Sequence, residues 1–334
     1  MSNSAVDKGA RVFVVGCGSI GQRHVRNLRA LGVANIAVFD PLPARMEHVA
    51  REYDVASCAN IPDGLARHPH AVLICTPPHL HTAIAKDAVD EGAHIFLEKP
   101  LASSLDGVDE LLDAARRVER VIYVAYNLRF HAGLRKLRGL LSGGVIGRPL
   151  VIRAEVGQYL PDWRPNQDYR AGYNVSAAMG GGIILDASHE LDYVRWLGGE
   201  IRSIYCAAGK LGDLEMEAED TAEMTLRIEG GILGQIHLDC VQRGYARNCK
   251  VIGTQGTLLW EFSEGVRHLM VDKTWRVYPI SPDANEMYVE EMRHFLACMR
   301  GVEKPLVDGD TGKRVLQIAL AARQSAATHG EISL

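Results

Sequence analysis

Three glycines near the start of the chain have the spacing of a loop that binds a diphosphate. They belong to the segment Gly16-Cys17-Gly18-Ser19-Ile20-Gly21, which has the pattern G-x-G-x-x-G and follows the short apolar run 11–15. In such a loop the first glycine permits a tight turn, the second lets the backbone approach a pyrophosphate, and the third lets a helix pack on a strand. Free amides at the start of that helix face the phosphates. We therefore predict cofactor contacts from Gly16, Gly18, Ser19, Ile20 and Gly21; a glycine-rich turn without a ligand is the alternative.

A carboxylate stands where such a loop would need one. Asp40 follows the apolar run 35–39, which is the second predicted strand. A carboxylate at this place accepts hydrogen bonds from the adenosine ribose hydroxyls and repels a 2′-phosphate, so it favours NAD over NADP. The alternative for Asp40 is a turn residue before Pro41. Because Arg45 lies nearby and could pair with a 2′-phosphate, NADP stays open as the second cofactor.

Polar residues also follow two later predicted strands. Thr76 and Pro77 come after the run 72–75, and Lys99 comes directly after the run 94–97 and Glu98. Because strand ends at this edge of a parallel sheet face the cofactor crevice, we expect Thr76 and Pro77 to flank the nicotinamide half of the cofactor. Beside a cationic nicotinamide ring the ammonium form of Lys99 would be disfavoured, which suits an acid or base working near neutral pH. A surface lysine is the alternative.

A second group of candidate residues follows three consecutive glycines. Gly180-Gly181-Gly182 would let the backbone approach a ligand closely, and Asp186 and His189 come next in the chain. We expect Asp186 at the start of a helix, with His189 three positions on and on the same face. A histidine can take a hydroxyl proton while the neighbouring carbon gives hydride to a nicotinamide. The alternative is that Asp186 only caps the helix.

The elements that must position these residues alternate between strand and helix up to about residue 125. Strands are predicted at 11–15, 35–39, 72–75, 94–97 and 121–125, and helices at 19–31, 43–53, 79–91 and 104–118. Short apolar runs that alternate with helices predict βαβ units and a parallel sheet. The first domain is therefore expected to be a doubly wound Rossmann domain over residues 1–125.

The pattern changes in the second part of the chain. Strands without intervening helices are predicted at 150–159, 201–209, 220–229, 231–240, 247–254, 256–262, 266–271 and 275–279, and helices at about 187–197, 285–300 and 310–328. Strands in such succession predict a large, open, mostly antiparallel sheet. We expect an α+β domain over residues 126–334 that binds substrate, with the last helix free to pack back on the first domain.

Five segments in this order resemble one known family. They are the glycine fingerprint, TPPHLH at 76–81, EKP at 98–100, YNLRF at 126–130 and GGGIILDASHELDYVRWLGG at 180–199. Together they resemble the Gfo/Idh/MocA oxidoreductases, a family that contains glucose–fructose oxidoreductase and inositol dehydrogenase. The resemblance implies catalytic roles for Lys99, Asp186 and His189, and further cofactor contacts from His81, Glu98 and Asn127.

The chain departs from that family at one point. Many relatives place the histidine four residues after the aspartate, whereas three residues separate Asp186 from His189 here. Alignment backwards from Trp196 keeps His189 at the family's histidine. The role of Asp186 therefore stays open, and Asp192 is expected to be solvated or to support the helix.

The loop 158–174 is the expected substrate region. The resemblance implies a sugar, sugar acid, polyol or sugar nucleotide that is oxidised at a hydroxyl, with bacterial surface-carbohydrate metabolism as one setting. Inositol or another polyol is the alternative. Aromatic faces and forked guanidinium groups suit such ligands, and arginines could hold a carboxylate or phosphate, with Arg243 and Arg247 as further candidates. The predicted substrate contacts are Lys99, Arg129, Trp163, Arg164, Tyr169, Arg170, Asp186 and His189. A solvated loop is the alternative.

Two other functions remain as alternatives for the whole protein. One is a catalytically silent ligand sensor, and the other is an enzyme of different chemistry, such as reduction of a tetrapyrrole or an imine.

Composition narrows the class of protein. The 334 residues are 47% hydrophobic and 23% charged with a net charge of −4, and they contain no basic block, so nucleic acid is not an expected partner. No apolar stretch is long enough for a membrane helix, and the start of the chain lacks the pattern of a signal peptide. Seven scattered cysteines without a C-x-x-C pair favour a reducing, cytoplasmic setting. Metal-ligand spacing is absent among the four histidines His68, His70, His79 and His81, so no metal is expected.

The open sheet is expected to pair subunits into a homodimer or homotetramer, because its uncovered face would otherwise expose apolar surface.

Overall fold

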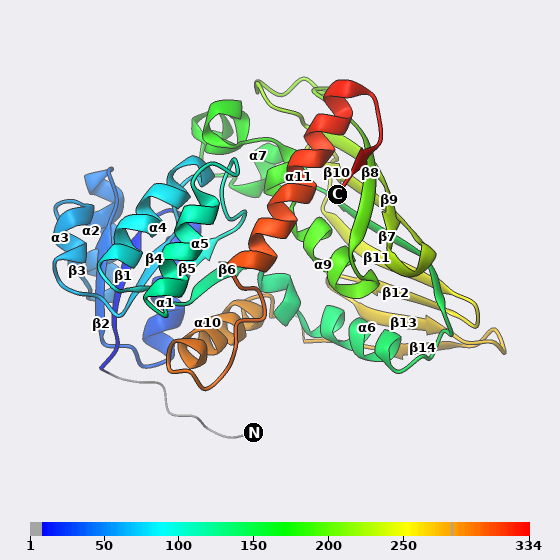
Figure 1. The fold of residues 1–334 in the computed structure, drawn as a ribbon, viewed down its shortest axis with the longest axis horizontal. Helices are drawn as coiled ribbons and strands as arrows, with labels where there is room; N and C mark the ends of the chain where they lie inside the picture. Colours follow the sequence, from blue (N-terminus) through cyan, green and yellow to red (C-terminus); the bar gives the residue numbers. More distant parts are fainter. Residues whose placement is uncertain (1–8, 282) are drawn as a thin grey trace. The chain divides into compact units, whose positions relative to one another are not determined.

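The computed structural model describes residues 9–281 and 283–334, which form two compact units (Figure 1). Among the described residues, the first unit comprises those up to Asn127 together with Asn285–Lys313, and the second comprises those of Leu128–Ala284 and Arg314–Leu334. The predicted division into 1–125 and 126–334 differs from these units, because a segment late in the sequence belongs to the first one.

In the described part of the first unit, six strands form one parallel sheet. They are β1 (Arg11–Val15), β2 (Asn35–Phe39), β3 (Ala56–Ser57), β4 (Ala71–Ile74), β5 (His94–Glu98) and β6 (Ile122–Ala125). Their order is β3-β2-β1-β4-β5-β6, which is the doubly wound arrangement of dinucleotide-binding domains. Every residue of β4 and β6 is buried, as expected for strands covered on both faces. The predicted Rossmann fold is confirmed.

Helices cover this sheet. They are α1 (Ser19–Ala30), α2 (Pro43–Tyr53), α3 (Ile61–Leu65), α4 (His81–Asp90), α5 (Val108–Arg117) and, from late in the sequence, α10 (Glu286–Met299). Helix α5 has acidic residues in its first turn and basic residues in its last, which complements the helix dipole. Helix α10 packs against α1, and α4 packs against α5.

The second unit is built on a nine-stranded sheet within the described residues. Its strands are β7 (Pro149–Gly157), β8 (Ile201–Gly209), β9 (Thr221–Ile228), β10 (Ile232–Asp239), β11 (Ala246–Gly253), β12 (Thr257–Glu261), β13 (Gly265–Leu269), β14 (Trp275–Tyr278) and β15 (Ile332–Ser333). The order is β14-β13-β12-β11-β7-β10-β9-β8-β15, and each neighbouring pair is antiparallel except β7 and β10. The predicted open, mostly antiparallel sheet is confirmed.

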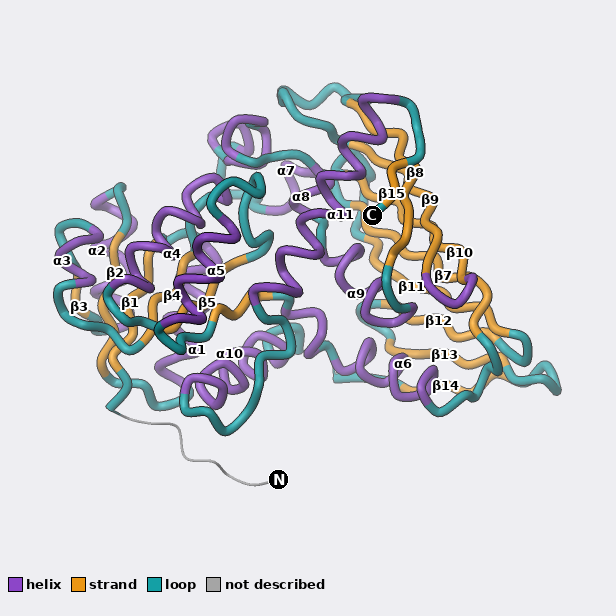
Figure 2. The backbone as a smooth tube through the Cα atoms, in the orientation of Figure 1, coloured by secondary structure: helices purple, strands orange, loops and turns teal. Residues whose placement is uncertain are grey.

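One face of this large sheet is covered by helices. The helices of the unit are α6 (Ala132–Ser142), α7 (Leu160–Trp163), α8 (Ile183–Asp186), α9 (His189–Gly198) and α11 (Gly309–Thr328), the last of which begins in the first unit. Helix α9 packs on β7 and β10, and α6 packs on β12 and β13 (Figure 2). Strand β9 alternates buried and exposed residues accordingly. Across residues 9–281 and 283–334 no helix combines the length and apolar character needed to cross a membrane.

The other face of the sheet differs from expectation. A groove of about 730 Å³ on this face is lined mainly by polar and charged residues of β7 and β9–β12, among them Arg153, Glu155, Glu223, His237 and Lys250. The expectation of a largely apolar open face was therefore wrong. Polar and apolar side chains alternate along strands such as β9, and the helices bury only the apolar set.

Candidate functional site

The glycine turn lies between β1 and α1, as predicted. Gly16 has φ +101° and donates its N–H to the carbonyl of Phe39 at 2.8 Å. The N–H of Cys17 donates to Oδ2 of Asp40 at 2.8 Å, and the N–H of Leu42 donates to Oδ1 at 2.8 Å. The structure thus brings the buried Asp40 against the turn and orients its carboxylate there.

The three glycines of the turn have different surroundings. A Cβ at Gly21 would lie 1.9 Å from the carbonyl oxygen of Gly16, so Gly21 is needed for packing between helix and turn. A Cβ at Gly18 would meet no atom of the described residues within 4 Å. No side chain of the described residues caps α1 at Gly18, so the first amides of the helix stay available to an anion.

Substitutions at these two glycines are expected to separate cofactor binding from folding. Gly18→Ala places a methyl group where a diphosphate would approach, in a backbone conformation that alanine adopts readily, so NAD should bind at least about tenfold more weakly at unchanged thermal stability. Gly21→Ala should instead lower the stability of the first unit by roughly 1–3 kcal/mol through overpacking. Calorimetric titration with NAD and thermal unfolding measure the two effects. Equal NAD affinity in Gly18→Ala and the wild type would contradict a diphosphate at this turn.

The ends of β4 and β5 are joined by a buried histidine. His81 places Nε2 2.8 Å from the carbonyl oxygen of Thr76 and Nδ1 3.0 Å from that of Pro100. The ring is fully buried, and this burial lowers its pKa. A direct cofactor contact was predicted for His81, but its two ring nitrogens are engaged by the main chain. Its position shows that it holds the turn after β4 against the turn after β5, where Lys99 lies.

A second histidine, which the sequence analysis missed, anchors Glu98. His24 on α1 is fully buried, and its Nε2 lies 2.7 Å from Oε1 of Glu98. The ring also meets the edge of Phe96, with centroids 4.9 Å apart. Helical spacing could have indicated His24, because it lies on the same buried face of α1 as Gly21 and Leu28. The strand end that carries Lys99 is thus tied to the helix that follows the glycine turn.

Helix α10 adds an aromatic residue to this cluster. The guanidinium of Arg23 lies 4.3 Å from the ring centroid of Tyr288. Burial raises the pKa of Tyr288, opposed by the positive charge of Arg23, and a side-chain hydrogen bond links Tyr288 to the buried Asn127. Asn127, a predicted cofactor contact, therefore lies within the first unit beside a residue from the late segment. No local pattern in the sequence links these two positions.

In the second unit, Asp186 and His189 belong to two different helices. Asp186 is the last residue of α8 and His189 is the first of α9, with the break at Ala187 and Ser188. The expectation that Asp186 begins the helix was wrong, because the chain leaves helical geometry at Ala187 (φ −98°, ψ 28°). Both side chains are more than nine-tenths buried. The interval of three residues therefore spans a helix break and not one turn of a continuous helix.

The carboxylate of Asp186 is bound by the predicted substrate loop. Its Oδ1 accepts a hydrogen bond from the hydroxyl of Tyr173 at 2.8 Å, and its Oδ2 accepts one from the amide of Asn174 at 2.6 Å. Gly182, with φ +104°, directly precedes the short helix α8 that brings Asp186 to this loop. Asp186 thus orients the part of the loop that contains Tyr173 and Asn174.

Other residues of the loop have partners nearby. Arg170 pairs with Asp168 at 2.9 Å and with Glu215 at 3.2 Å, and all three side chains are at least half exposed. The hydroxyl of Tyr169 accepts the N–H of Glu215, and the indole of Trp163 donates to the carbonyl of Gln158. Arg164 is exposed. Because Arg170 is already paired at the surface, its predicted contact with an anionic substrate would have to replace these carboxylates.

Two buried ion pairs hold helix α9. The guanidinium of Arg129 forms a forked pair with Asp192, with Nη2–Oδ1 at 2.7 Å and Nε–Oδ2 at 2.9 Å. Arg247 pairs with Glu190 at 2.9 Å and 3.3 Å. Asp192 and Glu190 are 1% and 0% exposed, so of the two alternatives for Asp192 solvation was wrong and support of the helix is confirmed. Arg129 and Arg247, both proposed as substrate contacts, are bound by these carboxylates.

Arg243 and Arg45 are two further arginines among the candidate residues. Arg243 lies over the ring of Tyr159, with its guanidinium carbon 3.5 Å from the centroid. Arg45 is exposed on α2. No group of three or more potential metal ligands occurs in the described part of the chain.

Comparisons with known proteins agree with this architecture. Residues 10–126 match the model of an oxidoreductase family with an NAD-binding Rossmann fold, and residues 134–259 match the GFO/IDH/MocA C-terminal domain. Myo-inositol 2-dehydrogenase of Thermotoga maritima is 29% identical over 94% of this chain and 96% of its own length. Inositol 2-dehydrogenase of Burkholderia cenocepacia is 30% identical over 74% of this chain and 72% of its own.

Solved structures share the whole fold. The WlbA dehydrogenase from Bordetella pertussis, in complex with NADH and UDP-GlcNAcA, superimposes with a TM-score of 0.85 at 22% identity, over 98% of this chain and 99% of that one. The family assignment rests on the two family models and on the inositol dehydrogenase relatives. This chain belongs to the Gfo/Idh/MocA family of oxidoreductases.

Proposed function

We propose that this protein is an NAD-dependent dehydrogenase that oxidises a secondary hydroxyl group of a cyclitol, a sugar or a sugar derivative. The observation that carries the proposal is the arrangement within the first unit. The glycine turn, the Asp40 carboxylate hydrogen-bonded to it, and the strand end with Lys99 lie at the carboxyl edge of one parallel sheet. The dehydrogenase activities named for the relatives support it.

The residues of the site fit a bound dinucleotide. The open space at Gly18 and the amides of α1 would receive the diphosphate, and the Asp40 carboxylate would accept the adenosine ribose hydroxyls. Bound NAD would supply the hydride acceptor. Because Asp40 would repel a 2′-phosphate, we infer a preference for NAD over NADP. Arg45 lies on the exposed face of α2, and an NADP-dependent enzyme would need it to reach the ribose.

Residues of this chain would transfer the proton of the substrate hydroxyl. His189 is proposed as the general base that takes the hydroxyl proton in the oxidation direction, and Lys99 is proposed to orient the hydroxyl and to relay the proton. Asp186 is assigned a positioning role, since both its carboxylate oxygens bind the loop residues Tyr173 and Asn174.

The test is turnover with a panel of alcohols. Purified protein with NAD is mixed with myo-inositol, scyllo-inositol, free sugars or UDP-linked amino sugars and their uronic acids, and the absorbance of NADH is followed. Turnover with inositols would resemble the relative from Thermotoga maritima, and turnover with UDP sugars would agree with the UDP-GlcNAcA bound to the dehydrogenase from Bordetella pertussis. NAD binding without reduction by any member of the panel would favour the ligand-sensor alternative and count against the proposal.

Assembly through the large sheet is a second proposal. We infer that the open face of β7 and β9–β12 pairs with a second copy of this chain in a homodimer or homotetramer, through hydrogen bonds and ion pairs because the face is polar. Light scattering coupled to size exclusion should give at least twice the mass of 36.6 kDa, and a sharp salt dependence is expected. A monomer at micromolar concentration would contradict this proposal.

All seven cysteines lack disulfides in the structure, which supports a reducing compartment such as the cytoplasm.

A further inference from the structure

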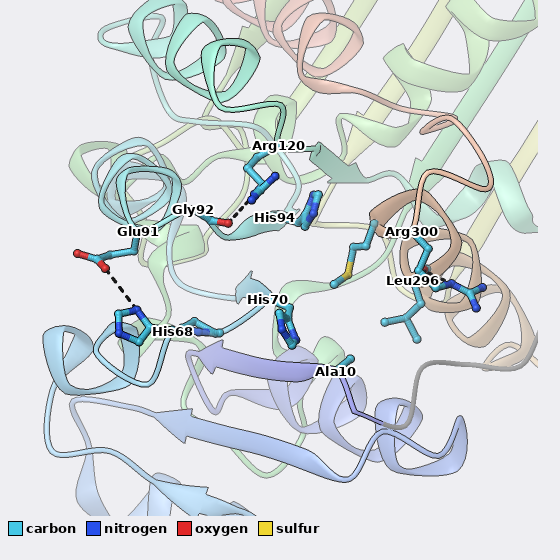
Figure 3. A pocket seen from close by; sticks show the side chains of 11 residues that line it. Ala10, His68, His70, Glu91, Gly92, His94, Arg120, Leu296 and Arg300 are labelled. Carbon is cyan, nitrogen blue, oxygen red and sulfur yellow. Dashed lines mark hydrogen bonds and ion pairs between the residues drawn. The ribbon is translucent and has the colours of Figure 1, made fainter.

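A pocket of about 390 Å³ opens at the amino edge of the parallel sheet, the edge opposite the glycine turn (Figure 3). Its walls come from the segments just before β1, β4, β5 and β6 and from the end of α10. The cofactor site lies at the carboxyl ends of the same strands, so the pocket is a separate place in the first unit. None of the residues assigned above to cofactor or catalysis lines it.

Two histidines of this pocket are fixed as hydrogen-bond donors. Nδ1 of His70 accepts the main-chain N–H of Arg11 at 3.0 Å, and Nδ1 of His94 accepts that of Val121 at 3.1 Å. A neutral imidazole whose Nδ1 is an acceptor carries its proton on Nε2. Both rings line the pocket, with His94 on the same wall as Arg120 and His70 across from them (Figure 3). Two N–H donors are therefore held in place by the backbone of neighbouring strands.

The charges around the pocket favour an anion. Arg120 and Arg300 line it, against one carboxylate, Glu91. Glu91 lies 3.9 Å from Nδ1 of His68 at the rim, on the far side from Arg300 in Figure 3. Arg120 is held by the carbonyl of Gly92.

The protonation state of His94 depends on this environment. Burial, and then the positive charge of Arg120, lower the pKa of His94 to about 4. His94 is therefore a neutral donor at physiological pH. An anion between these groups would pair with the guanidinium of Arg120 and accept hydrogen bonds from the neutral Nε2–H groups of His70 and His94.

The rest of the pocket is apolar. Ala10, Pro69, Leu296 and Met299 line it, and Ala10, Pro69 and Leu296 are buried. A volume of about 390 Å³ exceeds what a bare inorganic anion fills and lies within the range of small-molecule sites. A ligand that suits both walls has an anionic head for the histidine and arginine groups and a small carbon body for the apolar side chains.

We propose that this pocket binds a small organic anion, a phosphate monoester or a carboxylate, at a site separate from that of the cofactor. The head accepts hydrogen bonds from Nε2 of His70 and His94 and from Arg120, with Arg300 at the rim. The proposal does not depend on the proposed dehydrogenase activity, because it concerns the opposite edge of the sheet.

The probes are phenyl phosphate, benzoate and phenol, titrated calorimetrically in the presence of saturating NAD. Phenyl phosphate or benzoate should bind, and phenol, which has the same carbon body without the anionic head, should bind at least about tenfold more weakly. His70→Ala and Arg300→Ala, both at exposed positions, should each weaken anion binding about tenfold at unchanged NAD affinity. Arg293→Ala removes an exposed arginine of α10, the helix that Arg300 follows, and this arginine does not line the pocket. The variant should bind the anions as the wild type does.

A second measurement does not depend on any variant. In the wild type, nitrogen NMR of the histidine rings should show the Nε2 resonances of His70 and His94 shifting with phenyl phosphate while that of the exposed His48 stays in place. Three results would overturn the proposal: no binding of either anion at millimolar concentration, phenol binding as tightly as the anions, or anion binding that is equal in the wild type and both pocket variants.

Discussion

Lys99→Ala is expected to lower kcat by a factor of about 10²–10⁴ while the dissociation constant of NAD changes by no more than a few-fold. Lys99 directly follows β5. It belongs to a different strand end from the glycine turn and Asp40, which would hold the adenosine half of the cofactor. The substitution therefore removes a group for the reacting hydroxyl and leaves the diphosphate contacts in place. Steady-state kinetics with the substrate found in the panel, together with titration of NAD by fluorescence, measure both quantities.

Two companion variants sharpen the test. Lys86→Ala removes an exposed lysine of α4 that pairs with Asp90, and its turnover should equal that of the wild type. Lys99→Arg keeps a positive charge but cannot give up its proton near neutral pH. If Lys99 relays a proton, the arginine variant should be nearly as inactive as the alanine variant. If turnover survives in Lys99→Arg, Lys99 acts by charge and orientation alone, and normal turnover in Lys99→Ala would remove it from the mechanism.

The alanine variant is expected to fold, because other residues hold this strand end. His24 binds Glu98 from α1, and His81 lies against the carbonyls of Thr76 and Pro100. Both histidines are fully buried, whereas Lys99 is only partly so. A loss of activity in Lys99→Ala would therefore report on chemistry, and thermal unfolding of the first unit verifies this.

The fold could be predicted where local pattern decides it. The predicted strands 11–15 and 35–39 and the predicted helix 43–53 agree with the structure residue for residue, since short β-branched runs and a proline at the first helical turn leave few alternatives. The short β3 and α3 were missed, because two and five residues show no periodicity. Helix α6 was also missed; Gly133 and Gly139 lower its helix propensity.

Long-range packing could not be predicted from the sequence. Helix α10 was expected in the second domain, and its place beside α1 depends on contacts such as Arg23 with Tyr288 and Asn27 with Asn285. The same limit applies to the site. A charged residue in a helix, such as Asp192 or Glu190, is expected to face solvent unless a partner is known, and the partners Arg129 and Arg247 are 63 and 57 positions away. By contrast, the contact between Asp40 and the glycine turn follows from the βαβ motif itself.

Asp192→Ala is expected to destabilise the second unit by roughly 3–5 kcal/mol, because it leaves the guanidinium of Arg129 buried without its forked partner. The two side chains are 6% and 1% exposed, so water cannot take the place of the carboxylate. All four tryptophans, Trp163, Trp196, Trp260 and Trp275, belong to the second unit. Their fluorescence during urea denaturation therefore reports the unfolding of that unit alone. As a control, Arg170→Ala breaks a pair at the surface and should leave the midpoint unchanged.

The double variant Arg129→Met/Asp192→Leu separates stability from function. Removing both charges should restore stability to the wild-type level or raise it by about 1–4 kcal/mol, because the desolvation cost of two buried ions disappears with them. The pair nevertheless ties α9 to the segment Asn127–Phe130, and α9 begins at His189. If the forked geometry orients that helix, the double variant should be stable yet lose catalytic efficiency by about tenfold or more, since small misplacements of a general base are costly. A double variant with normal stability and normal kcat/KM would show that the pair is only a packing element and does not orient α9 for catalysis.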